Sequence, residues 1–155
     1  MQEIERKYLI KKELWKPTGK GTTIKQGYLS ITAKSVVRVR TADQKAYLTI
    51  KGMRTGITRT ELEYEIPKHE AEVLLKLCLN SAVEKIRYFE EIGEITWEID
   101  VFGGENEGLI IAEVELESED QLIDLPEWIE MEVSDDYRYF NSWLSKNPYK
   151  TWNAF

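Results

Sequence analysis

The first residues of the sequence place charged side chains at every second position. Glu3, Glu5 and Lys7 follow this spacing, and side chains at i, i+2 and i+4 of a β-strand lie on one face. Carboxylate oxygens suit Mg²⁺ or Mn²⁺, whereas an ammonium group binds phosphate oxygens. The spacing therefore predicts a face on which a divalent cation and a phosphate group could bind side by side.

Most other segments with a strand-like pattern also carry one ionic and one apolar face. The remaining ionic positions are Arg38, Arg40, Thr49, Lys51, Arg59, Glu61, Glu63, Glu65, Lys85, Arg87, Glu98, Asp100, Glu113, Glu115 and Glu117. Acidic residues gather in the first, fifth and eighth of these segments, and basic residues in the third, fourth and sixth. Because ordinary surfaces mix the two signs, this sorting favours two charged populations that face each other.

The simplest interpretation of the ionic face is a solvated surface, since antiparallel sheets often expose one side to water. The sorting by sign favours instead a closed sheet whose ionic face points inward. Burying carboxylates and cations is costly unless each group finds a counter-charge, a metal or a ligand. A complex of a divalent metal with a polyphosphate would satisfy both populations.

Eight segments show the period-two pattern of strands. They span residues 2–9, 23–31, 35–41, 46–51, 59–66, 83–90, 94–101 and 108–117. The short connections between several of them indicate antiparallel neighbours. Apolar residues at helical spacing predict two helices, one within residues 67–79 and one ending before Pro148. The pattern predicts a mainly β, α+β protein: a β-rich barrel with helices packed on its outside.

The composition limits the class of protein. The length of 155 residues suits one domain over residues 1–155, since no linker or repeat divides the chain. A formal net charge of -7 argues against nucleic-acid binding. No apolar run approaches the roughly 20 residues of a membrane span. The lone Cys78 fits a reducing compartment, so we expect a cytoplasmic protein without a membrane partner.

The segment Glu3-Ile4-Glu5-Arg6-Lys7 resembles the Glu-x-Glu-x-Lys signature of CYTH proteins, the triphosphate tunnel metalloenzymes. Further segments resemble the family in the same order: Gln26-Gly27-Tyr28-Leu29, Val37-Arg38-Val39-Arg40, Leu48-Thr49-Ile50-Lys51, Arg59-Thr60-Glu61-Leu62-Glu63, Lys85-Ile86-Arg87-Tyr88, Trp97-Glu98-Ile99-Asp100, Ala112-Glu113-Val114-Glu115 and Tyr137-Arg138-Tyr139-Phe140-Asn141. The resemblance covers nearly the whole chain and is to the compact bacterial members. It implies a closed eight-stranded antiparallel barrel, the triphosphate tunnel.

The resemblance also implies roles for individual residues. Lys85 and Tyr28 would gate the tunnel or orient the attacking water, and Glu5 would take part in catalysis through the metal. The implied phosphate-binding residues are Lys7, Arg38, Arg40, Lys51, Arg59, Arg87 and Arg138. The implied ligands of Mg²⁺ or Mn²⁺ are Glu3, Glu5, Glu113 and Glu115, completed or supported by Glu61, Glu63 and Asp100.

The function implied by the resemblance is metal-dependent hydrolysis of inorganic tripolyphosphate with release of phosphate. The same fold would suit a class IV adenylyl cyclase, a thiamine or nucleoside triphosphatase, or a noncatalytic polyphosphate-binding module. No adenine or thiamine pocket is recognisable in the sequence, and phosphate binding alone would not need the acidic strands. A β protein with a solvated charged face and a protein partner is a further alternative. We expect a small-molecule polyphosphate as partner and a monomer or homodimer.

Overall fold

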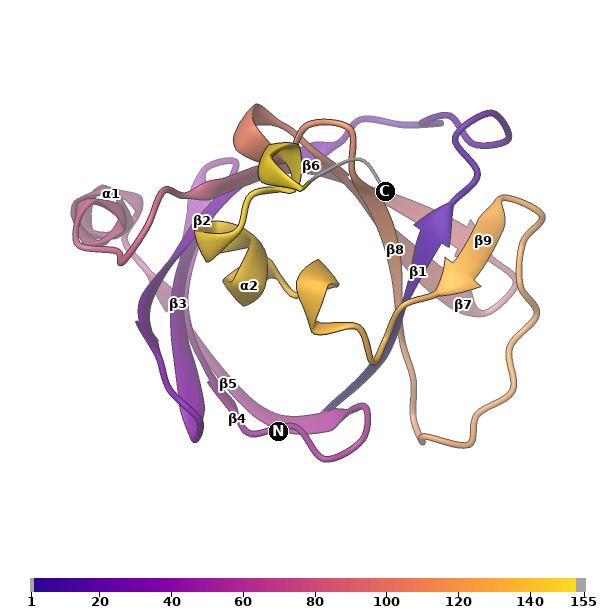
Figure 1. Cartoon of the computed structure of the whole chain (residues 1–155), viewed down its shortest axis with the longest axis horizontal. Coiled ribbons are helices and arrows are strands. Elements are labelled where there is room, and N and C mark those ends of the chain that lie inside the picture. Colours follow the sequence, from indigo (N-terminus) through magenta and orange to yellow (C-terminus); the bar gives the residue numbers. More distant parts are fainter. Residues whose placement is uncertain (1, 153–155) are drawn as a thin grey trace.

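The chain folds into a closed antiparallel barrel, as the computed structural model of residues 2–152 shows (Figure 1). Eight strands follow one another around the barrel in the order β5-β4-β3-β2-β6-β7-β8-β1, and β1 pairs again with β5. The strands are β1 (Gln2–Ile10), β2 (Thr22–Ile31), β3 (Ser35–Ala42), β4 (Lys45–Gly52), β5 (Thr58–Ile66), β6 (Val83–Ile92), β7 (Ile95–Phe102) and β8 (Ile110–Glu115). The predicted eight-stranded barrel is confirmed.

Tight turns keep neighbouring strands in register. Asp43 in the β3–β4 turn has φ 52° and Gly93 in the β6–β7 turn has φ 64°, which is the left-handed geometry that two-residue hairpins require. In the β3–β4 pair, Arg38 lies opposite Thr49, and in the β6–β7 pair Arg87 lies opposite Asp100. These registers align polar positions across the sheet, so the ionic faces of the strands form one inner surface.

Strand β1 closes the barrel by pairing along both of its edges. One edge pairs with β8, where Lys7 lies opposite Glu113. The other edge pairs first with β5, where Glu3 lies opposite Arg59, and then with β9 (Ile129–Glu132). The four-residue β9 was not predicted, because so short a segment shows too little alternation to be recognised.

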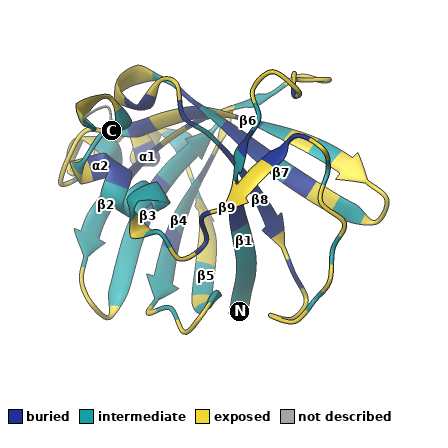
Figure 2. Cartoon of the chain, turned by 45° about the vertical axis from the view of Figure 1, so that its right-hand side comes forward, coloured by how far each residue is buried: buried dark blue, intermediate teal, exposed yellow. Residues whose placement is uncertain are grey.

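Loops and β9 cover part of the apolar outer face of the barrel. Trp97 is fully buried, and its ring centroid lies 5.6 Å from that of Tyr8 and 5.5 Å from that of Trp128 in edge-to-face contacts. Trp15, from the β1–β2 connection, belongs to the same core cluster. Figure 2 shows the buried residues along the strands of this side. Aromatic side chains from irregular segments therefore cover a face that helices were expected to cover.

The two helices have different positions. Helix α1 (Lys68–Lys76) packs on the outside of the barrel through Ala71 against Val39 and Ala46, as predicted, although it ends before Cys78. Helix α2 (Asn141–Lys146) lies across one end of the ring of strands (Figure 1), so the prediction that this helix packs on the outside was wrong. Short 3-10 turns at η1 (Gly104–Asn106), η2 (Tyr137–Tyr139) and η3 (Tyr149–Thr151) complete the described elements. None of the helices within residues 2–152 is long and apolar enough to cross a lipid bilayer.

Candidate active site

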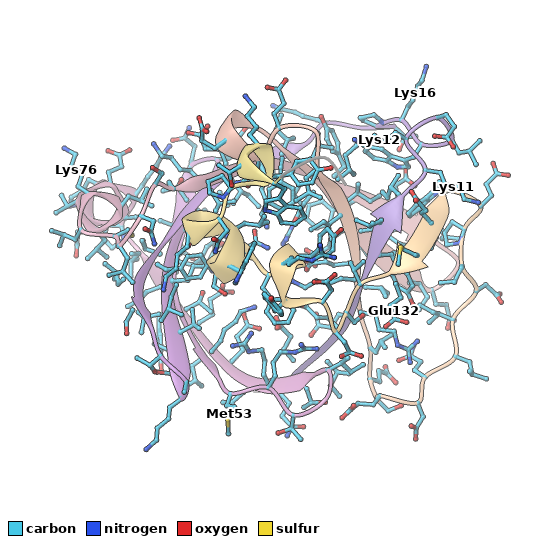
Figure 3. The ribbon with its side chains drawn as sticks, in the orientation of Figure 1. Lys11, Lys12, Lys16, Met53, Lys76 and Glu132 are labelled. Atoms are coloured by element: carbon cyan, nitrogen blue, oxygen red, sulfur yellow. The ribbon has the colours of Figure 1, made fainter. Side chains whose placement is uncertain are left out.

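The barrel encloses a cavity of about 270 Å³ whose wall is mainly ionic. Figure 3 shows many side chains directed into the ring of strands, whereas the labelled Lys76 on α1 points outward. Val36, Ile57 and Phe140 contribute apolar surface to the wall. Its charged members are Lys7, Arg38, Arg40, Lys51, Arg54, Arg59, Lys85, Arg87, Glu3, Glu5, Glu61, Glu63, Glu98, Glu113 and Glu115. The predicted site residues therefore converge on one cavity, except for Asp100 and Arg138.

Asp100 lies behind the wall, where it holds two cations. Its Oδ1 atom accepts a hydrogen bond from Arg87 Nε (2.7 Å), and its Oδ2 atom accepts one from Arg87 Nη2 (2.9 Å). The same Oδ2 atom lies 2.7 Å from Lys85 Nζ. Burial alone would raise the pKa of Asp100, but Arg87 and Lys85 hold this pKa far below its usual range. Both carboxylate oxygens bind cations, so Asp100 supports the site through Arg87 and Lys85, and a direct contact with a metal stays a prediction.

Arg138 does not line the cavity. It belongs to the 3-10 turn η2, and its Nε and Nη2 atoms donate to Asp136 at 3.0 and 2.7 Å. Its guanidinium carbon lies 5.6 Å from the ring centroid of Trp152. The prediction of Arg138 as a phosphate ligand is not supported, because the turn directs this side chain into a separate contact with Asp136.

A group of buried cations occupies the side of the cavity formed by β2, β3 and β6. Arg40 Nε donates to Gln26 Oε1 at 2.8 Å, and burial, followed by the charges of Arg38 and Arg87, lowers the pKa of Arg40 to about 9. Arg38 Nη2 donates to Thr49 Oγ1 at 3.2 Å. The Nε atom of Arg38 is buried without a hydrogen-bond partner within residues 2–152. This side of the cavity therefore has positive charge that an anion would stabilise.

A group of carboxylates occupies the opposite side, on β1 and β8. Lys7 Nζ lies 3.9 Å from Glu5 Oε1 and 3.6 Å from Glu113 Oε1. Burial, followed by the charge of Glu113, raises the pKa of Glu5 to about 8 even though Lys7 opposes the change. Nearby, Glu3 Oε1 lies 3.1 Å from Lys51 Nζ. Although burial opposes the change, Lys7, followed by Arg87 and Lys85, holds the pKa of Glu113 below its ordinary value. Glu5 is therefore the member of the Glu5–Glu113 pair that lacks sufficient positive charge.

The Glu5–Glu113 pair fits a hydrated divalent cation. Within residues 2–152, no three Asp, Glu, His or Cys side chains already form a cluster that could hold a metal ion. Mg²⁺, however, keeps several water ligands and needs only one or two carboxylates from a protein. A cation beside Glu5 would also oppose the burial and the repulsion from Glu113 that raise the pKa of this residue. The donors present are therefore of the right type for Mg²⁺ or Mn²⁺.

Lys85 and Tyr28 lie beside the cationic group. Lys85 Nζ donates to Asn141 Oδ1 at 3.0 Å, and the Tyr28 hydroxyl accepts a hydrogen bond from Gln26 Nε2 at 3.2 Å. Burial lowers the pKa of Lys85 to about 7, with Arg87 adding to the effect and Asp100 opposing it. Both residues line the cavity, so either can contact a bound ligand.

Several residues of the cavity were not predicted as site residues. Glu98 was assigned to the ionic face by alternation, and its Oε2 atom lies 2.9 Å from Arg87 Nη1. Arg54 lies in the β4–β5 turn, and Phe140 and Asn141 lie at the start of α2. Alternation gives no information about such positions, because a turn and a helix start do not follow the period of a strand.

The closed barrel with its ionic interior defines the class of protein. The profile of the CYTH domain matches residues 1–142. The chain therefore belongs to the CYTH family, as its sequence indicated.

Particular relatives cover almost all of the chain. It is 49% identical over 150 residues to an inorganic triphosphatase of Acetivibrio thermocellus, with 96% of each chain covered. It is 35% identical over 152 residues to an inorganic triphosphatase of Nitrosomonas europaea, with 94% of this chain and 97% of the relative covered. A crystal structure of an inorganic triphosphatase is similar at a TM-score of 0.66 and 33% identity, covering 92% of this chain and 93% of the other.

Proposed function

We propose that this protein is an inorganic triphosphatase, which hydrolyses a linear triphosphate inside the barrel in a metal-dependent reaction that releases phosphate. One observation carries the proposal: carboxylates that include Glu5 and cations that include Arg40 line the same cavity, and Arg38 Nε is buried there without a hydrogen-bond partner within residues 2–152. The raised pKa of Glu5 and the lowered pKa of Arg40 agree with a shortage of counter-charge on each side. A metal–polyphosphate complex supplies both missing charges. The names of the two relatives support the same activity.

The metal in this proposal is Mg²⁺ or Mn²⁺. Glu5 and Glu113 are its principal ligands, with Glu3 and Glu115 beside them on the same strands. When bound, the cation supplies Lewis-acid charge that polarises the phosphoryl group. Lys7, between Glu5 and Glu113, holds the two carboxylates in place and is available to a phosphate oxygen.

The buried cations bind the phosphate chain and stabilise the charge that develops during phosphoryl transfer. Arg87 is held by two hydrogen bonds to Asp100, so its position is fixed before the substrate arrives. Arg38 has a free Nε atom within the described part of the chain, which gives it a donor for a phosphate oxygen. Lys85 and Tyr28, at the edge of this group, orient the attacking water.

The cavity favours a bare polyphosphate as substrate. Its volume of about 270 Å³ lies below the roughly 300–1,000 Å³ of sites that enclose drug-sized molecules. Charged side chains form most of the wall, and a nucleobase or a thiamine ring would need apolar or stacking surface. This argument favours tripolyphosphate over ATP or thiamine triphosphate.

A cytoplasmic location, the absence of a nucleic-acid partner and a monomeric or homodimeric state stay predictions.

The experiment is to measure phosphate and pyrophosphate release from tripolyphosphate, ATP and thiamine triphosphate, with Mg²⁺, Mn²⁺ or EDTA. Phosphate release from tripolyphosphate that requires the metal is the expected result. Pyrophosphate and cyclic AMP from ATP would identify a cyclase instead. Binding of tripolyphosphate without turnover of any substrate would identify a noncatalytic binding module.

A further inference from the structure

The cavity has a deeply buried end and a more exposed end. At the buried end, the side chain of Lys85 is 1% exposed, and that of its partner Asp100, behind the wall, is 0% exposed. On the other side, Glu63 is 43% exposed and Arg54, in the β4–β5 turn, is 24% exposed. The β4–β5 turn therefore lies at the mouth through which a ligand reaches solvent.

Helix α2 blocks the buried end. Asn141, its first residue, accepts hydrogen bonds from Lys85 Nζ (3.0 Å) and Gln26 Nε2 (3.1 Å) through Oδ1. Leu144 is fully buried in a core cluster with Val83. A phosphate can reach the cations at this end, but a sugar attached to that phosphate would meet the helix. A substituted triphosphate must therefore enter with its unsubstituted end first.

Arg54 extends over the mouth from the β4–β5 turn. Its guanidinium carbon lies 4.8 Å from the ring centroid of Phe140, and the neighbouring Met53 points away from the barrel (Figure 3). An ion pair with Asp135 at 3.8 Å also holds Arg54, but the Asp135 side chain is 91% exposed. Because such exposed pairs contribute little, Arg54 can exchange Asp135 for a phosphate group at small cost.

The other arginine of the mouth is already engaged. Arg59 Nε and Nη2 donate to Gly52 O at 3.0 and 2.8 Å. Arg54 is therefore the arginine at the mouth whose N–H groups are more readily available to a ligand than those of Arg59. It also adds positive charge to the mouth.

A linear inorganic triphosphate has a free phosphate at both ends, whereas a nucleoside triphosphate has a free phosphate at one end. When one free end lies among the buried cations, the group at the mouth differs between the two ligands. It is the second terminal phosphate of an inorganic triphosphate, or the esterified phosphate of a nucleoside triphosphate. The terminal phosphate offers more charge and more oxygens to a guanidinium group, which binds them in pairs. We propose that Arg54 is a specificity-determining residue that binds the outer terminal phosphate and favours unsubstituted triphosphates. This inference rests on the proposed function.

The test compares wild type, Arg54→Gln, Arg54→Lys and a control, Lys34→Gln, in which an exposed lysine of the β2–β3 turn loses the same charge. Calorimetry with EDTA gives Kd for tripolyphosphate and for ATP. We expect Arg54→Gln to weaken tripolyphosphate binding about tenfold or more while ATP binding changes much less. Arg54→Lys retains the charge without the paired donors and should give an intermediate Kd. Lys34→Gln should match wild type.

The two proposals fail in different ways. If the wild type binds no tripolyphosphate and releases no phosphate from it, the proposed function is wrong. If the wild type binds and hydrolyses tripolyphosphate but Arg54→Gln leaves the ratio of the two Kd values unchanged, only the role of Arg54 is overturned. An equal loss for both ligands also overturns it, because Arg54 would then act as general positive charge. Thermal melting of each variant checks the fold, and Arg54→Lys carries the test if Arg54→Gln does not fold.

Discussion

Lys85 Nζ lies 2.7 Å from Asp100 Oδ2, and both side chains are almost completely buried. Asp100 also binds Arg87 through two hydrogen bonds, so one carboxylate positions two cations of the cavity. A buried charge is stabilised only as long as its partner is present. The Lys85–Asp100 contact therefore links the stability of the barrel to the geometry of its phosphate-binding side.

Replacing Asp100 with Asn should destabilise the fold, because Arg87 would be left as a buried cation without this partner and Lys85, whose pKa Asp100 raises, would have to lose its proton. Breaking a buried pair in this way costs about 3–5 kcal/mol. Urea denaturation measures the free energy of unfolding, and Asp124→Asn, at an exposed loop position, is the matched control. Equal stability of the Asp100 variant and wild type would show that the two cations do not depend on this carboxylate.

Alternation predicted the strands and the residues that share their ionic faces, whereas the closed barrel followed from the sorting of charges by sign and from the resemblance to the CYTH family. Glu5 and Arg40 could be assigned to the cavity because a strand has a fixed period of two and a closed sheet has only one inner face. Alternation could not show that Asp100 binds Arg87 and Lys85, because a face does not specify a partner. It also could not place Arg54 or Asn141, whose positions depend on a turn and on the packing of α2 across the barrel.

Glu5→Gln should abolish most metal-dependent turnover without harming the fold. The carboxylate is proposed as a metal ligand, and loss of a preorganised electrostatic group commonly lowers kcat by roughly 100-fold or more. In EDTA, the melting temperature should equal or exceed that of wild type, because the change removes a charge that is poorly compensated in the folded state. Steady-state phosphate release and thermal melting measure the two effects.

The control for this change is Glu72→Gln, which removes an exposed carboxylate from α1. Its turnover and melting temperature should match those of wild type. Wild-type turnover in Glu5→Gln itself would contradict the assignment of Glu5 to the metal.

Glu5 should make the metal-free protein lose stability as the pH rises from about 4.5 to about 8, an effect that Lys85, with its pKa lowered to about 7, opposes only above about pH 7. The pKa of Glu5 is raised from its ordinary value of 4.5 to about 8 in the folded state, first by burial and then by Glu113. Between these values the folded state binds more protons than the unfolded state, so the free energy of unfolding falls with rising pH. Urea denaturation in EDTA across this window measures the slope, and Glu5→Gln should flatten it.

The same proton should make metal binding depend on pH. A metal ligand must be ionised, so a cation that binds Glu5 below about pH 8 displaces its proton and binds more tightly as the pH rises. Calorimetry of Mg²⁺ or Mn²⁺ in buffers with different ionisation enthalpies counts the protons released. A proton count near zero at neutral pH, together with unchanged affinity at higher pH, would exclude Glu5 as the ligand that is deprotonated.

Tripolyphosphate should stabilise the protein through Arg40. Burial and the neighbouring charges of Arg38 and Arg87 lower the pKa of Arg40 to about 9, so an anion at this position relieves the repulsion between these guanidinium groups. A ligand that binds only the folded state adds about 2.7 kcal/mol to stability when it is present at 100 times its Kd. The increase in melting temperature on adding tripolyphosphate with Mg²⁺ measures this effect. Arg40→Gln should reduce this increase, because the variant lacks the group that binds the anion. The unliganded variant should be equally or more stable than wild type, because the buried charge is also removed. An increase in melting temperature as large as that of wild type would mean that the phosphate chain binds elsewhere.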